Sequence, residues 1–122
     1  MNYTSIEQSK KLLSLGLKAE SADMWYQHIG VSIKDGSQKS IYFPMVIRDN
    51  ESDEDIPCWS VGALLDVIPF LTQITTSYKK TRVDVVIIYK KGFKDSCHYE
   101  RAETLIDALV QMITWLYENK CN

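Results

Sequence analysis

The sequence predicts an α+β fold in which a mainly antiparallel sheet of about four strands packs against three helices, in the order helix, hairpin, helix, hairpin, helix. Three observations support this prediction. Apolar residues recur with a helical period near the end of the chain, over residues 103–119. Asp35 and Gly36 form a strong hairpin-turn signal between two strand-like runs. Residues 82–90 are apolar on both faces, as a central strand would be.

Composition limits the class of protein. The 122 residues suffice for a single domain, 1–122, whose core needs neither disulfides nor metal. A hydrophobic share of 45% is ordinary for a globular chain, and a net charge of -2 gives no general attraction to nucleic acid or anionic membranes. Three widely spaced cysteines suit a reducing cytoplasm. The sequence shows neither a signal-peptide pattern nor an apolar run of membrane-spanning length, so we expect a cytoplasmic protein without membrane contact.

The first helix is expected over residues 5–15. Thr4 and Glu7 fit a capping box, in which Thr4 caps the helix and Glu7 reaches back to it. Gly16 can adopt the left-handed conformation that ends a helix. The side expected to face the core carries Leu12, Leu13 and Leu17.

A hairpin should follow this helix. Residues 24–29 are rich in aromatics and read as a strand that can continue to residue 34. After the turn at Asp35 and Gly36, the return strand covers residues 40–43 and can extend to residue 47. Pro44 cannot donate to a ladder, so this return strand is expected at a sheet edge or with a bulge.

An acidic loop occupies residues 48–55. Asp49, Glu51 and Asp53 alternate like the first ligands of a calcium-binding EF-hand loop, but Glu54 stands where that loop needs Gly and Ser60 where it needs Glu. We therefore interpret the segment as a solvated loop, not as a metal site.

A short buried helix should begin after Ser60, which is a good N-cap. Trp59 and Leu64 have the spacing of a hydrophobic staple, and Pro69 should end the helix near residue 68. Gly62 either allows close packing of another backbone or is simply tolerated. Pro57 is expected to end the preceding loop.

The second half of the chain contains a predicted polar loop over residues 72–81, the central strand, and a short returning strand over residues 96–100. The last and longest helix is expected over residues 103–119, with two adjacent apolar rows. Thr114 falls on its polar stripe. Trp115 lies near the edge of its apolar arc, where it is either an exposed anchor for a partner or, as we favour, part of the core.

No catalytic constellation can be assigned. Cys97 and His98 are neighbours on a strand, so their side chains point to opposite faces and cannot act together as nucleophile and base. Whether Cys97 meets His28 depends on the tertiary fold. Zinc-ligand spacings and a glycine-rich phosphate loop are both missing from the sequence. We therefore expect a protein that is not an enzyme and that uses no cofactor or metal.

Two kinds of partner remain. The leading hypothesis is a module that binds an unknown protein partner, including self-association through a sheet edge. Its candidate contact residues are Asp53, Glu54, Asp55, Trp25 and Tyr42. The alternative is a nucleic-acid-associated accessory protein that uses the basic 78–94 region, with Lys79, Lys80 and Lys91 as contacts.

Four stretches carry a family resemblance: residues 8–17, 22–26, 57–69 and 102–110. Through them the chain resembles a group of small uncharacterised proteins found in prophages and other mobile elements of Bacteroidetes. The resemblance spans most of the chain but rests on caps, turns and core helices. It implies a cytoplasmic bacterial or phage context and supplies no catalytic or binding residues.

Overall fold

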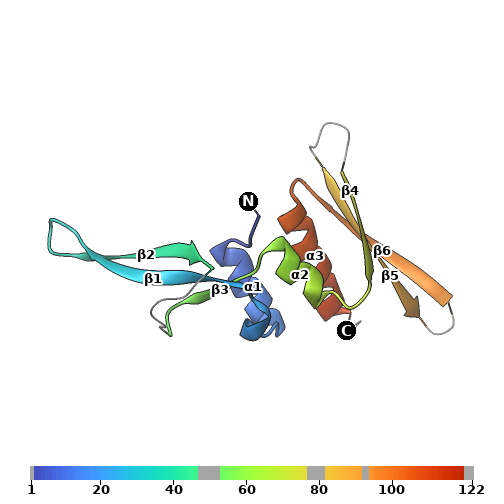
Figure 1. The fold of residues 1–122 in the computed structure, drawn as a ribbon, viewed down its shortest axis with the longest axis horizontal. Helices are drawn as coiled ribbons and strands as arrows, with labels where there is room; N and C mark the ends of the chain where they lie inside the picture. The colour runs from blue at the N-terminus through green and yellow to red at the C-terminus, as the bar shows by residue number, and fades with distance from the viewer. Residues whose placement is uncertain (1, 47–52, 77–81, 92–93, 120–122) are drawn as a thin grey trace.

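The computed structural model describes residues 2–46, 53–76, 82–91 and 94–119. These residues form an α+β fold with two three-stranded antiparallel sheets (Figure 1). The predicted class is confirmed, but the strands divide between two sheets instead of forming one sheet of about four. The elements in chain order are α1 (Ile6–Leu15), the 3-10 helix η1 (Ala19–Ser21), β1 (Met24–Ser32), β2 (Gln38–Met45), β3 (Ile56–Cys58), α2 (Val61–Val67), β4 (Leu71–Thr76), β5 (Val83–Lys91), β6 (Lys94–Ala102) and α3 (Leu105–Glu118).

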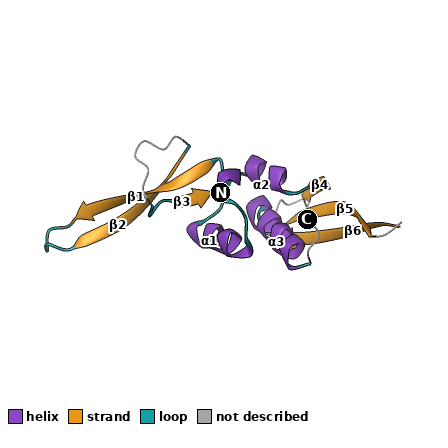
Figure 2. Ribbon diagram, turned by 90° about the horizontal axis from the view of Figure 1, so that it is seen from below, coloured by secondary structure: helices purple, strands orange, loops and turns teal. Residues whose placement is uncertain are grey.

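The three α-helices lie between the two sheets, and the β1–β2 hairpin extends away from them (Figures 1 and 2). The main core forms where α1, α2 and α3 meet β5. Its fully buried side chains include Leu12, Trp59, Leu64, Leu109 and Met112. The helices therefore join the two sheets into one body, with the hairpin as an arm on one side.

The cap of α1 lies one residue later than predicted. Ser5 is the N-cap: its Oγ accepts a hydrogen bond from the Gln8 amide (3.1 Å), and the Gln8 side chain accepts one from the Ser5 amide (2.9 Å). Thr4 and Glu7 therefore do not form the box, because the Thr4 hydroxyl is used in a buried cluster against Ser9 and the Trp59 amide. The predicted end at Gly16 is confirmed, with φ +106°. Leu13 was expected in the core but is 36% exposed.

The first sheet has the strand order β2-β1-β3. The hairpin turn is where the sequence predicts it: Gly36 has φ +85°, and Asp35 Oδ1 accepts a hydrogen bond from the Ser37 amide (2.9 Å). The edge position of the strand that contains Pro44 is also confirmed. The strand β3 was not predicted, because Pro57 was expected to end a loop; instead Pro57 pairs with Trp25 inside the sheet.

The second sheet has the order β4-β5-β6, so the predicted central strand is confirmed as β5. Residues 71–76 form β4, whereas the sequence predicted a polar loop over 72–81; the rest of that loop lies outside the described residues. One face of β5 is buried through Val83, Val85 and Ile87, and its other face is open, with Ile88 44% exposed. The strand β6 is longer than the predicted 96–100 segment.

The helices α2 and α3 follow the predicted signals closely. Ser60 caps α2 by accepting a hydrogen bond from the Ala63 amide (3.2 Å), and the helix stops before Pro69. The atom nearest to a Cβ built on Gly62 is Ser60 Oγ at 3.8 Å, so among the described residues no other backbone packs against this glycine. Thr114 of α3 is buried, not on a solvated stripe, because its hydroxyl donates to the Val110 carbonyl (2.8 Å).

Candidate functional site

Among the described residues, the edge of β6 that does not pair with β5 borders a hollow. β6 pairs with β5 on one side, and no other described strand pairs with it. A cavity of about 580 Å³ is lined by five consecutive residues of this strand: Cys97, His98, Tyr99, Glu100 and Arg101. Successive side chains of a strand point to opposite faces. A hollow that touches all five must therefore run along the strand edge, where both faces can be reached.

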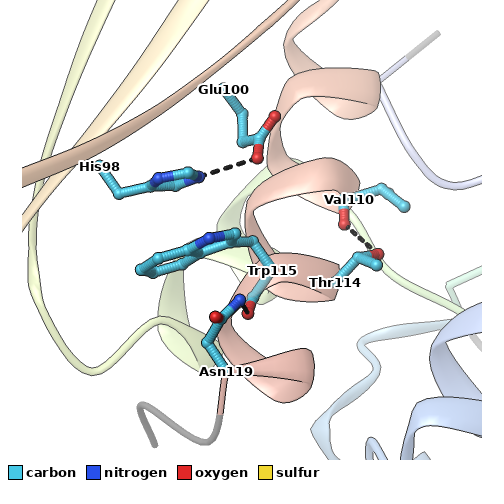
Figure 3. Close-up of polar contacts among 6 residues, drawn as sticks. All are labelled: His98, Glu100, Val110, Thr114, Trp115 and Asn119. Carbon is cyan, nitrogen blue, oxygen red and sulfur yellow. Dashed lines mark hydrogen bonds and ion pairs between the residues drawn. The ribbon is translucent and has the colours of Figure 1, made fainter.

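The helix-facing wall of this hollow is a stacked histidine. The His98 ring lies 3.7 Å from the Trp115 ring, centroid to centroid, with an angle of 8° between their planes (Figure 3). His98 Nε2 is 2.8 Å from Glu100 Oε1. Trp115 also contacts Tyr89, at a centroid distance of 5.7 Å. These contacts hold the His98 ring against α3 and the Glu100 carboxylate against that ring.

The opposite wall is more exposed. Tyr99 is 61% exposed, which is unusual for a large aromatic side chain. Arg101 Nε donates to Asp84 Oδ1 (2.7 Å), and its guanidinium lies 5.9 Å from the Tyr99 ring centroid. The hydrogen bond from Arg101, followed by its positive charge, holds the pKa of the Asp84 carboxyl below its ordinary value. The wall therefore presents an aromatic ring beside a neutralised ion pair.

The candidate reactive side chains of the sequence do not come together at this edge. Cys97 and His98 lie on opposite faces of β6, as the sequence predicts. His28 belongs to β1, in the other sheet beyond the helices, so Cys97 does not meet it (Figure 1). Within the described ranges, no three His, Cys, Asp or Glu side chains gather closely enough to hold a metal ion.

The predicted contact residues of the first sheet do not form one patch. Asp53 and Glu54 are exposed at the turn before β3, and Glu54 Oε2 lies 2.8 Å from His28 Nδ1. Asp55, expected in a solvated loop, is buried, because its Oδ1 accepts a hydrogen bond from the His28 amide (2.9 Å). Trp25 and Tyr42 are both partly buried and lie on opposite faces of the sheet, so they cannot contact the same surface of a partner.

The residues of the nucleic-acid alternative lie at or beyond the limits of the description. Lys79 and Lys80 fall outside the described residues. Lys91 is the last residue of β5, and its side chain is outside the description. The basic cluster therefore stays a prediction. None of the helices in the described part of the chain is both long and apolar enough to cross a membrane.

Sequence reasoning missed His98, Glu100 and Trp115 as neighbours. The spacing of His98 and Glu100 places both on one face of a strand, and that signal was readable. The stacking of Trp115 joins residues that are distant in sequence, so no local pattern marks it.

Comparisons with protein-family models, with curated proteins and with solved structures found no match to this chain.

Proposed function

We propose that this protein is a non-enzymatic interaction module of a prophage or mobile element, and that it binds an extended segment of a protein partner along β6. The observation that carries the proposal is the hollow along the free β6 edge, lined by residues on both faces of the strand. In strand addition, backbone hydrogen bonds provide affinity and alternate side chains provide specificity. The β6 edge offers both kinds of contact.

The two walls set the chemistry of the partner segment. One set of its alternate side chains would lie near the His98 and Trp115 stack. The other set would lie on the Tyr99 ring, which favours an aromatic or long apolar residue. Because Arg101 already pairs with Asp84, a strongly charged segment gains little on that side. We therefore expect a partner segment that alternates between apolar and neutral polar residues.

The test is affinity capture from host lysate, with and without nuclease, followed by mass spectrometry. The wild-type protein is compared with Tyr99→Lys, which removes the ring and adds a charge at the hollow. The matched control is Ile88→Lys, which places the same charge at an exposed position on the same face of the sheet but outside the hollow.

A protein that is still captured after nuclease treatment, is not captured by Tyr99→Lys and is captured by Ile88→Lys would support binding at β6. Equal capture by both variants would refute it. Capture that disappears with nuclease would instead support the alternative, in which Lys79, Lys80 and Lys91 contact nucleic acid. In that case binding should also weaken steeply as salt is raised.

A further inference from the structure

The hydrogen-bond pattern of the hairpin shows which backbone groups of β2 face outward. At the turn, the Ile33 amide donates to the Ser37 carbonyl (2.9 Å). In an antiparallel pair, positions that exchange hydrogen bonds alternate with positions that do not. Counting from that bond along the register, alternate residues of β2 turn their N–H and C=O groups away from β1, namely Gln38, Ser40, Tyr42 and Pro44.

Three other features agree with this count. Pro44 stands at an outward position, where its missing N–H costs no hydrogen bond inside the sheet. Pro57 occupies a position in β3 that faces away from β1 by the same count. The His28 amide, which faces away from β2, donates to Asp55 Oδ1 just before β3 begins. The alternation is therefore consistent across all three strands.

The outward edge of β2 is left open in the first sheet. Among the described residues, no strand pairs with it. Its outward positions Gln38, Ser40 and Tyr42 are uncharged, and Lys39 is the single charged residue of the strand. Native proteins usually protect such an edge with charges, proline or a covering segment. Here proline protects the end at Pro44, and residues 38–42 remain able to pair.

We propose that two copies of this chain pair antiparallel along their β2 edges, with Ser40 of one copy opposite Ser40 of the other. In this register Gln38 lies opposite Tyr42 of the other copy, and about six backbone hydrogen bonds form by the antiparallel pattern. Lys39 lies opposite Ile41, so no like charges face each other. If the register shifts by two residues, Pro44 lies opposite Gln38 of the other copy. Because proline has no N–H, each copy then lacks one hydrogen-bond donor at that pair.

The shape of the molecule favours a second copy as the occupant. The hairpin projects from the helices, and antiparallel pairing places the two helical bodies at opposite ends of the joined arms (Figures 1 and 2). Ile29, Ile41 and Phe43 share one face of the hairpin, and Ile29 and Phe43 are exposed there. Pairing extends that apolar face across both copies, and the β6 edge is not used.

The first test is a disulfide across the symmetry axis. Opposite Cα atoms at a hydrogen-bonded position lie about 5.5 Å apart, which is within disulfide range. In a background of Cys97→Ser and Cys121→Ser, oxidised Ser40→Cys should give a crosslinked dimer on a non-reducing gel. Gln38→Cys is the control: its two copies would lie about 13 Å apart at the rise of a strand, too far for a bond. Equal crosslinking of both variants, or none, would overturn the register.

The second test is sedimentation equilibrium. Ser40→Pro removes an amide that the monomer does not use, as Pro44 already does, and should abolish the dimer while circular dichroism stays that of a folded chain. Ser40→Ala keeps the amide but loses the hydroxyl contact to His28, and should remain dimeric. A dimeric Ser40→Pro would overturn the proposal. If that variant does not fold, the cysteine pair decides.

Discussion

The two sheets share a design and differ in how they are covered. Each is three-stranded and antiparallel, and the middle strand of each, β1 or β5, is 9 residues long. The second sheet packs its inner face on α3, and Val85 and Ile87 are fully buried there. Among the described residues, the first sheet is anchored near its base, where Tyr26, Ile56 and Cys58 form a small second core. Beyond that core, the hairpin has no covering layer among the described residues.

This difference shows that packing against the helices, not strand pairing, distinguishes the second sheet from the hairpin arm. The pairing of β1 with β2 is as regular as that of β5 with β6. Hydrogen bonds that are exposed to solvent and supported by few buried contacts break at a low free-energy cost. Those of core strands break only when the whole protein unfolds. The arm should therefore exchange its amide hydrogens much faster than β5 if it is monomeric.

The largest expected contrast is between two aromatic side chains. Trp59 is fully buried, and its indole N–H donates to Ser21 Oγ (2.9 Å). Trp59→Ala should lower the free energy of unfolding by about 3–5 kcal/mol. Phe43 lies on the arm and is 46% exposed, so Phe43→Ala should cost less than about 1 kcal/mol. Urea denaturation of both variants measures the two losses, and equal losses would contradict the division into packed core and hairpin arm.

A smaller effect is expected at the cluster that joins the first sheet to the helices. Thr4 is fully buried; its Oγ1 accepts a hydrogen bond from the Trp59 amide (3.0 Å) and lies 2.8 Å from Ser9 Oγ. Thr4→Val leaves that amide without its acceptor and should cost about 1–3 kcal/mol. Thr4→Ser keeps the hydroxyl and is the control. Urea titration should separate the two variants, and a fully stable Thr4→Val would mean that the cluster does not anchor the sheet.

A local effect is expected at Asp55. Its carboxylate accepts a hydrogen bond from the His28 amide just before β3 begins. It therefore adds one hydrogen bond to the ladder between β1 and β3. Asp55→Ala should cost about 1 kcal/mol and speed hydrogen exchange at the His28 amide. Asp55→Asn keeps an acceptor oxygen and should preserve most of the protection. Unchanged exchange in Asp55→Ala would show that the carboxylate is not the acceptor in solution.

Local signals in the sequence predicted local structure well. Ser60, Gly16 and the turn at Asp35 and Gly36 act within a few residues, so their effect can be read without knowing the fold. The strand β4 could not be read in this way. Its Leu-Thr-Gln-Ile-Thr-Thr run looks like a polar loop and becomes a strand through pairing with β5.

The candidate site was less predictable than the fold. In the sequence, Asp55 looks like one of several loop carboxylates. In the fold it is buried and accepts a hydrogen bond from the His28 amide, which does not pair with β3. The wall at β6 depends on His98 meeting Trp115 from another element. Both arrangements depend on tertiary contacts, whereas the sequence shows each of these residues only in its local context. The separation of Trp25 from Tyr42 likewise depends on the register of β1 with β2.

A pH-dependent effect that should separate the two sheets concerns Tyr26. Its hydroxyl donates to the Thr4 carbonyl (2.7 Å), and burial, together with nearby Cys58, raises the pKa of Tyr26 from 10.0 to about 12. A raised pKa in the folded state means that the unfolded state loses its proton first. The stabilising contribution is therefore complete below pH 10 and is lost as pH rises through about 12. Tyr26→Phe should lack this alkaline loss, as measured by thermal melting between pH 9 and about 12. Hydrogen exchange should show the loss in β1 before β5, because Tyr26 belongs to the small core that anchors the first sheet. Simultaneous loss in both sheets would mean that they unfold as one unit despite their different coverage.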